Sequence, residues 1–537
     1  MIKLLSRQRK AALRRAMRSE RRLRKEGRLH IIDDICAVLA TTPLPIPPTQ
    51  FAKLFFGAAV PHAELALRQY LYLRQVLYKL PRSLLATLVR SGGPLVYPLP
   101  APWRKLVTGA GFAVQPVLSR VLWIAYVLFY WAYGCLTIGR LLVQAAQGTK
   151  QAMTGKFAHF EYIGEGQTPR PAEDGRSFDV MTWYRLWLGR APDIESLSYR
   201  VKGRSRPSVD SSVHALRTPA FPVLAPIPYL RFVGWCLAAI SLSAADLLRG
   251  RWWHAMMLSE AALARFVRGV PNEALARDYL FNNSGWLYRP LWSYEAERRG
   301  SRILCYHYST NSAAFKRPGG YPPEHYTWRI TNWPLHVVWD EEQAAFIRRA
   351  VGETGVQIAG PIWFSSSPEP SPSLDKPSIA IFDVQPFRPS MGPSLAAQYN
   401  YYAPETCLTF VEDASRAIRE AGFEMLWKRK RSIGKGAHPK YREMARRTDA
   451  HGLALVVSAE QSAVRIIEAA DAVVSMPFTS TAILARHLGK PSCYYDPTGT
   501  IHKDDRGAHD IPVLVGYEDL VSWVRSLQHA RTAIVDD

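Results

Sequence analysis

Three consecutive hydroxyl side chains, Thr479, Ser480 and Thr481, follow a short apolar run at residues 471–476. The run predicts a strand and residues 480–489 predict a helix, so the hydroxyls lie in the turn between them. Ligands of open α/β sheets bind at the ends of such strands, and the amides at a helix start bind phosphate. Ser and Thr are also common helix N-caps for purely structural reasons. These residues alone do not separate a phosphate site from an N-cap.

A basic loop, KRKRSIGKGAHPKY at residues 428–441, directly follows another predicted strand. Positive charge at this place favours the binding of a nucleotide phosphate, and Pro439 restricts the backbone next to His438. A solvated loop with an incidental histidine is the alternative interpretation. The candidate nucleotide-binding residues of the loop and the turn are Lys428, Lys430, Lys435, His438, Pro439, Thr479, Ser480 and Thr481.

In this setting the run MPFTSTA at 476–482 resembles the polysaccharide-biosynthesis family named for its PFTS motif. The resemblance covers roughly the half of the chain from Asn282 onward, and it includes the runs PLWSYEAERRG, YSTN, VVWDEEQ, FDVQP and YYDPTG. An HP dipeptide followed later by a Ser/Thr pair is also similar to bacterial sialyltransferases and capsule Kdo transferases of the GT-B type. The resemblance implies that His438 contacts the donor phosphate, and that Ser480 and Thr481 hold it at a helix start.

The resemblance further implies inverting transfer of an acidic sugar from a CMP-sugar donor, in the biosynthesis of a bacterial capsule or O-antigen. A carboxylate must then accept a proton from the acceptor hydroxyl. The candidate catalytic residues are Asp340, Glu341 and Asp383. The sialyltransferases carry an acidic pair followed by Gly, whereas here Asp340, Glu341 and Glu342 are followed by Gln343.

Each of these acidic residues has a structural alternative. Asp340 and Glu341 fit the first turn of a helix, where acids favour the dipole, and Asp383 fits the cap of a turn. A phosphate held by protein donors needs no metal, and no DxD motif in a suitable loop would hold one. We therefore expect neither a metal nor a cofactor beyond the nucleotide-sugar. Two other functions remain open: a UDP-sugar transferase or sugar-nucleotide epimerase, and a non-catalytic scaffold of capsule assembly at the membrane.

Alternating short strands and helices predict an α/β protein with two Rossmann-like domains, GT-B-like, after a basic and mostly helical N-terminal region. A stretch rich in Ser and Pro separates the two domains. The expected divisions are a basic helical region at 1–110, an apolar and basic helical region at 111–270 with an option of membrane association, an acceptor-side domain at 271–364, a linker at 365–377 and a nucleotide-sugar-binding domain at 378–537.

The net charge of +23 over 537 residues indicates a surface that binds polyanions such as anionic lipid or phosphorylated substrates. Nucleic acid is the least favoured of these partners, because no nucleic-acid-binding motif accompanies the charge. The six cysteines are far apart in sequence and form no CxxC pair, which argues against a zinc knuckle or redox motif and favours a reducing compartment. The expected partners are a nucleotide-sugar, a glycan or lipid-linked acceptor, and an anionic membrane surface.

The segment 121–139 carries no charge and five of its residues are Trp or Tyr, as is typical of a membrane interface. A transmembrane hairpin with the apolar run at 232–245 is disfavoured, because the intervening residues carry many Lys and Arg that resist translocation. We expect peripheral or monotopic attachment to the cytoplasmic face of the inner membrane. A single membrane span near residue 130 is one alternative, and a soluble protein with a buried aromatic helix is an equal one.

Overall fold

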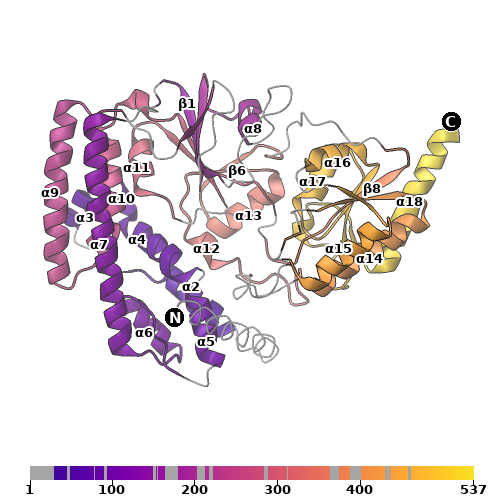
Figure 1. Cartoon of the computed structure of the whole chain (residues 1–537), viewed down its shortest axis with the longest axis horizontal. Coiled ribbons are helices and arrows are strands. Elements are labelled where there is room, and N and C mark those ends of the chain that lie inside the picture. Colours follow the sequence, from indigo (N-terminus) through magenta and orange to yellow (C-terminus); the bar gives the residue numbers. More distant parts are fainter. Residues whose placement is uncertain are drawn as a thin grey trace.

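The computed structural model describes the chain in segments. They are residues 30–44, 49–77, 79–89, 93–148, 153, 155–163, 180–201, 212–216, 222–283, 288–310, 313–362, 374–386, 401–429, 433–434, 437–457 and 461–536. The strongly basic residues 1–29 and residues 365–373 of the expected linker lie outside these segments. A layer of helices, a first sheet and a second sheet follow one another along the long axis of the molecule (Figure 1).

The first sheet has seven parallel strands in the order β3-β2-β1-β4-β5-β6-β7. Its strands are β1 (Phe157–Ile163), β2 (Ser196–Val201), β3 (Val213–Leu216), β4 (Asp278–Asn282), β5 (Arg302–Tyr306), β6 (Leu335–Val338) and β7 (Gly355–Ile358). The helices interspersed with these strands include α8 (Val180–Leu186), α11 (Leu291–Arg298), α12 (Tyr326–Arg329) and α13 (Glu341–Val351). Strands β2 and β3 lie on one side of β1, and strands β4 to β7 lie on its other side. The sheet is therefore doubly wound.

The first sheet begins at Phe157, so the boundary expected at residue 271 is wrong, and the region 111–270 is not purely helical. The strands β1 to β3 escaped the sequence analysis because β1 and β2 carry buried ionic side chains. Glu161 on β1 is ion-paired with Arg200 on β2, and His159 lies 2.9 Å from the same carboxylate. A charged strand lacks the apolar run by which a buried parallel strand is usually recognised.

The second sheet has six parallel strands in the order β10-β9-β8-β11-β12-β13. Its strands are β8 (Ser378–Phe382), β9 (Glu424–Lys428), β10 (Leu455–Val457), β11 (Ala472–Ser475), β12 (Ser492–Asp496) and β13 (Val513–Val515). The helices are α14 (Pro404–Glu420), α15 (Pro439–Ala450), α16 (Ala463–Ala469), α17 (Ser480–His487) and α18 (Tyr517–Asp536), with the 3-10 turn η6 (Arg506–Ala508). The expected fold class, two Rossmann-like domains after a helical region, is confirmed.

Local signals explain why the second sheet matches its prediction so closely. The strands β8 and β11 are buried along their whole length, so their sequences read as short apolar runs. Helix α14 begins with Pro404, whose missing N–H costs nothing there. The chain leaves α14 through Gly422, whose φ of 77° is the left-handed conformation that glycine adopts without strain.

The helical layer comes mainly from the N-terminal part of the chain. Its helices are α2 (His30–Thr41), α3 (Thr49–Phe56), α4 (Ala63–Leu71), α5 (Leu80–Val89), α6 (Ala101–Gly109), α7 (Pro116–Gln147), α9 (Pro226–Leu248) and α10 (Trp253–Gly269). Gly134 allows α7 to approach α10, because a Cβ at this position would lie 2.7 Å from the Cβ of Leu258. The helices α7 and α9 form the edge of the molecule farthest from the second sheet (Figure 1).

Polar contacts join the loop before α12 to the segment around η6, and so connect the two sheets. The backbone amide of Lys316 donates to Asp505 at 2.7 Å, and that of Arg506 donates to the Tyr321 hydroxyl at 2.6 Å. The Arg506 guanidinium also lies over the Tyr321 ring, 3.8 Å from its centroid, and forms an ion pair with Glu324. These contacts hold the carboxyl-end loops of the first sheet against the second domain.

Candidate functional site

The hydroxyl turn predicted from the sequence lies at the carboxyl end of β11 and begins α17. Thr479 is the N-cap residue, but its side chain makes no cap and donates to the Met476 carbonyl at 2.9 Å instead. The Thr481 hydroxyl lies 2.8 Å from that of Ser475. Since no side chain caps the helix, the amides of its first turn are left for an anion, as at many phosphate sites.

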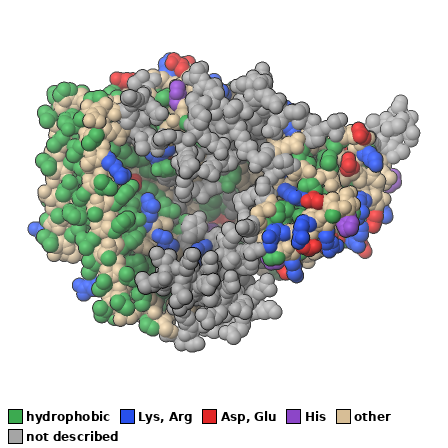
Figure 2. All heavy atoms as spheres, viewed as in Figure 1, with side chains coloured by type: hydrophobic (Ala, Val, Ile, Leu, Met, Phe, Trp, Pro, Cys, Tyr) green, Lys and Arg blue, Asp and Glu red, His purple; other side chains and the backbone are tan. Residues whose placement is uncertain are grey.

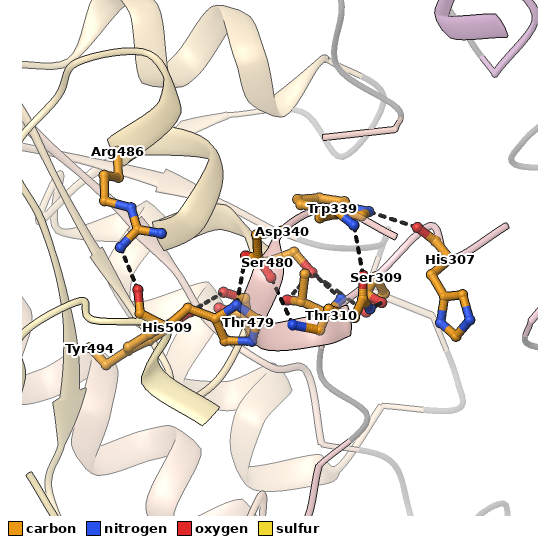
Figure 3. Close-up of polar contacts among 11 residues, drawn as sticks. His307, Ser309, Thr310, Trp339, Asp340, Thr479, Ser480, Arg486, Tyr494 and His509 are labelled. Atoms are coloured by element: carbon orange, nitrogen blue, oxygen red, sulfur yellow. Dashed lines mark hydrogen bonds and ion pairs between the residues drawn. The ribbon is translucent and has the colours of Figure 1, made fainter. Parts of the chain in front are cut away.

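The Ser480 hydroxyl turns away from its own helix and contacts the first sheet's domain. It accepts from the backbone amide and the hydroxyl of Thr310, both at 3.2 Å, and donates to the Ser309 hydroxyl at 3.4 Å (Figure 3). We call Ser309, Thr310, Thr479, Ser480 and Thr481 the hydroxyl cluster. It brings five alcohol groups from the two domains to one place.

The Ser309–Thr310 loop follows β5 and is held by residues just after β6 and in the first turn of α13. The Trp339 indole donates to the His307 carbonyl at 2.6 Å, and the Gln343 side-chain amide donates to the Ser309 carbonyl at 2.8 Å. The run YSTN was part of the family resemblance, but its residues were not among the predicted site residues. The one signal that could have found them is a polar run at the carboxyl end of a predicted strand.

Asp340 contacts both its own helix and the other domain. Its Oδ1 accepts from the Gln343 amide at 2.9 Å, so Asp340 is the N-cap of α13, directly before the first turn in which the sequence placed it. Its Oδ2 lies 2.6 Å from Nδ1 of His509, a residue just after η6 in the second domain (Figure 3). The His509 carbonyl in turn accepts from the Arg486 guanidinium of α17. His509 was not among the residues predicted for the site.

The two other candidate carboxylates lie apart from Asp340. Glu341 is exposed on the first turn of α13 and is ion-paired with Arg348 at 2.5 Å. Asp383 is buried directly after β8, where it accepts a hydrogen bond from the Tyr441 hydroxyl. Burial raises the pKa of Asp383 above its ordinary value, although hydrogen bonding from Tyr441 opposes this rise. Asp340 is therefore the one of the three that lies beside the hydroxyl cluster.

The basic loop reaches the same edge of the second sheet from the other side of β8. The His438 amide donates to the Pro386 carbonyl at 2.8 Å, and Pro439 opens helix α15. Lys428 ends β9 and is largely buried, with its ammonium donating to the Arg429 carbonyl at 3.1 Å. Lys430 and Lys435 lie outside the described residues.

The strand order explains how these segments meet. Strand β8 pairs with β9 on one side and with β11 on the other, so the starts of α15 and α17 flank the carboxyl end of β8. The connections leave β8 and β11 in opposite directions, which makes this position the topological switch point of the sheet. Ligands of doubly wound sheets bind in the crevice that opens there.

One protein-family model matches the part of the chain that contains the hydroxyl turn. The family model "Polysaccharide biosynthesis PFTS motif protein" matches residues 235–524, which is more than half of the chain. No curated protein sequence matches the chain.

Three solved structures overlap weakly with the chain. UGT73P12 of Glycyrrhiza uralensis, in complex with glycyrrhetinic acid 3-O-monoglucuronide, gives a TM-score of 0.35 at 10% identity and covers 70% of this chain and 88% of its own. The lipopolysaccharide outer core galactosyltransferase WaaB gives 0.32 at 10%, covering 71% and 91%. A double-alanine variant of Os79 from O. sativa, in complex with UDP, gives 0.33 at 11%, covering 69% and 91%. Scores below 0.5 do not by themselves establish a shared activity.

Proposed function

This chain belongs to the polysaccharide biosynthesis PFTS motif family, and on that premise we propose that it is a glycosyltransferase of bacterial capsule or O-antigen assembly. We further propose inverting, metal-independent transfer of an acidic sugar from a CMP-sugar donor. The observation that carries this proposal is the position of the motif: Thr479 and Ser480 lie at the switch point of a Rossmann-ordered sheet, and Ser480 contacts the opposite domain. A donor bound there would place its sugar between the two domains.

The donor phosphate would lie at the start of α17. The backbone amides of that first turn and the hydroxyls of Ser480 and Thr481 would supply hydrogen-bond donors, with the Ser480 hydroxyl turning from Ser309 to the phosphate, and the helix dipole favours a negative charge. His438 and Lys428 would approach from the opposite side of β8. Donors fixed in advance around the leaving phosphate stabilise the charge that develops there as the sugar departs.

The proton of the acceptor hydroxyl would go to the pair formed by Asp340 and His509. Because Asp340 Oδ2 lies 2.6 Å from Nδ1 of His509, the carboxylate favours the tautomer that carries its proton on Nδ1. That tautomer leaves a lone pair on Nε2, as in the histidines of hydrolase triads. We therefore assign the general base to His509 and the orientation of its ring to Asp340.

The apolar face of α7 and α9 would attach the enzyme to lipid. Figure 2 shows hydrophobic side chains gathered along the edge that these two helices form. We define the apolar face by its exposed large hydrophobic residues, which are Val117, Leu118, Val121, Leu122, Ile124, Leu128, Phe129, Tyr133, Leu136 and Val143 on α7, and Ile227, Leu230, Leu237 and Leu248 on α9. A contiguous patch of this size on a soluble surface marks an interaction site.

Both helices are long and apolar enough to cross a membrane, yet their packing favours a position in the plane of its surface. The buried residues of α7 run along one side of nearly its whole length, from Ser119 to Ala145, and face the protein. The helix behind it, α10, carries Glu260, Arg265 and Arg268, which a bilayer core would not tolerate. The charged residues flanking the apolar face are exposed arginines, among them Arg120, Arg140 and Arg231, which suits anionic lipid.

Nucleotide binding tests the proposed donor. Isothermal titration of the purified protein with CMP and with UDP should give a measurable affinity for CMP and a weaker one for UDP. Release of CMP from a CMP-linked acidic sugar would support the proposed transfer. Release of UDP from a UDP-sugar would instead indicate a UDP-sugar transferase. Absence of binding to either nucleotide would overturn the assignment.

Replacement of His438 separates an enzyme from a scaffold. In a cell that depends on this protein for its polysaccharide, His438→Ala should abolish the polymer if the site is catalytic. Polymer at the wild-type level, from a variant expressed and folded as well as wild type, would instead point to a scaffold without catalysis.

A further inference from the structure

A second group of reactive side chains lies behind the Ser309–Thr310 loop. Cys305, His307 and His336 are all buried, and one ligand atom from each lies within 4.8 Å of the other two. Among the described residues this is the group of His, Cys, Asp or Glu side chains placed so that three could hold one metal ion. It is separate from the hydroxyl cluster and from the Asp340–His509 pair.

The parallel pairing of β5 and β6 creates this arrangement. Cys305 and His336 are direct partners in the register of the two strands, and the His307 amide donates to the Val337 carbonyl at 2.9 Å. Residues two apart on a strand project from the same face, so Cys305 and His307 share one side of the sheet. The ligands therefore come from a rigid part of the fold rather than from a mobile loop.

The two imidazoles satisfy only one nitrogen of each ring. Nε2 of His307 lies 3.1 Å from Nδ1 of His336, while Nδ1 of His307 and Nε2 of His336 have no hydrogen-bond partner in the described structure. Burial lowers the pKa of His307 well below its ordinary value and that of His336 to about 4, so both rings are neutral near pH 7. Each neutral ring carries one N–H.

Either tautomer of this pair leaves one buried N–H without an acceptor. If His307 donates from Nε2, the N–H of His336 lies on its orphaned Nε2. If His336 donates from Nδ1, the N–H of His307 lies on its orphaned Nδ1. An unpaired buried donor is destabilising, and native proteins rarely retain one without a reason. An ion bound by these rings is one such reason.

We propose that Cys305, His307 and His336 bind one transition-metal ion of the kind that accepts thiolate and imidazole ligands, with Zn²⁺ as the probe. Zinc bonds of ~2.0 Å to nitrogen and ~2.3 Å to sulfur would hold tetrahedral ligand atoms roughly 3.3 to 3.6 Å apart. The three ligand atoms here lie within 4.8 Å of one another, and the two facing imidazole nitrogens are 3.1 Å apart. On binding, the thiol of Cys305 releases its proton to solvent and a sulfur–metal bond forms, with no change in oxidation state.

This ion would be structural. It would fix His307, directly after β5 and two residues before Ser309, and so hold the loop that contacts Ser480. It lies on the first sheet, whereas the donor phosphate is assigned to the second, so the proposal does not depend on the transferase assignment. The absence of nucleotide binding would leave it untouched.

Metal content of the intact protein tests the proposal. The full chain is purified without a polyhistidine tag, incubated with one equivalent of Zn²⁺, desalted, and measured by inductively coupled plasma mass spectrometry. We expect about one Zn²⁺ per chain for wild type. Replacement by Co²⁺ should give the intense near-ultraviolet absorption of a thiolate bound to cobalt, which surface histidines cannot produce.

Variants locate the ion. Cys305→Ser should abolish the thiolate–cobalt absorption, and His336→Gln should lower metal retention at least tenfold. Cys407→Ser provides the matched control, because Cys407 is a buried cysteine of the second domain and should leave both signals intact. Circular dichroism excludes variants that fail to fold. A wild-type chain that retains no ion and shows no thiolate–cobalt absorption, or a folded Cys305→Ser variant that keeps this absorption, would overturn the proposal.

Discussion

Asp340 and His509, far apart in sequence, form a hydrogen bond of 2.6 Å between the two domains. The second oxygen of Asp340 caps helix α13, so the carboxylate is fixed at both ends. His509 is almost fully buried, and its backbone has a φ of 51°, which non-glycine residues seldom adopt. Residues with rarely populated backbone dihedral angles are found more often at functional positions than elsewhere.

Replacement of either residue of this pair should impair the chemical step. We expect His509→Asn to lower kcat by about 10² to 10⁴, the range found for general bases, with nucleotide affinity nearly unchanged. Asp340→Asn should lower kcat less, because it acts through the orientation of the imidazole. Steady-state kinetics with the donor identified by nucleotide binding, together with calorimetric affinities, would measure both effects.

Glu341→Gln is the control for this experiment, since Glu341 neighbours Asp340 but faces solvent in a pair with Arg348. Exposed ion pairs contribute at most about 1 kcal/mol, so activity and stability should stay at the wild-type level. A Glu341 variant with the same loss as the His509 variant would move the base to the first turn of α13.

Removal of the Ser480 hydroxyl should weaken binding of the nucleotide-sugar more than it destabilises the fold. A hydrogen bond to a charged group contributes about 1.5–3 kcal/mol, so Ser480→Ala should weaken nucleotide affinity about tenfold or more. Calorimetric titration of the variant measures this loss. Thr409→Ala on the exposed side of α14, where the hydroxyl bonds its own helix, is the matched control. Equal affinities for both variants and wild type would remove Ser480 from the donor site.

The second domain was predictable because each of its signals is local. Short apolar strands, amphipathic helices and turn residues such as Pro404 and Gly422 indicate the same alternation. Thr479 to Thr481 could be placed at a strand end for the same reason. The early strands were not predictable, because the burial of Glu161 depends on its pairing with Arg200, which only the assembled sheet provides.

The partner of Asp340 could not be found from sequence either. His509 lies in an irregular segment without periodicity, and it meets Asp340 only when two separate sheets come together. The cluster of Cys305, His307 and His336 is a similar case, because its third member lies on a neighbouring strand. Spacing along a chain does not reveal which strands will be neighbours, so sites that combine strands are visible only in the fold.

Acid should destabilise the protein in part through His336. Its pKa is about 4 in the folded state, so between the ordinary histidine pKa of ~6.5 and about 4 the unfolded chain binds a proton that the folded chain does not. Stability is therefore full above this window and falls as pH decreases through it, by up to about 1.4 kcal/mol per pH unit for one histidine.

Urea unfolding at pH 7 and pH 5, with a chelator present, measures this slope. We expect His336→Asn to lose less stability than wild type between the two pH values, whatever its stability at pH 7. His451→Asn, at an exposed histidine at the end of α15, should keep the wild-type slope. Identical slopes for all three proteins would show that His336 is protonated as easily in the folded state as in the unfolded one.

Charge placed on the apolar face should prevent lipid binding. Phe129 and Leu136 are 64% and 53% exposed on α7, so Phe129→Glu with Leu136→Glu should leave the fold intact while adding two charges where lipid would lie. Each residue withdrawn from lipid forfeits roughly 1.5–3 kcal/mol, so binding to vesicles containing anionic lipid should fall at least tenfold in a flotation assay. Leu188→Glu is the control, because Leu188 is 96% exposed but lies outside α7 and α9. Equal flotation of the double variant and wild type would show that lipid does not contact this face.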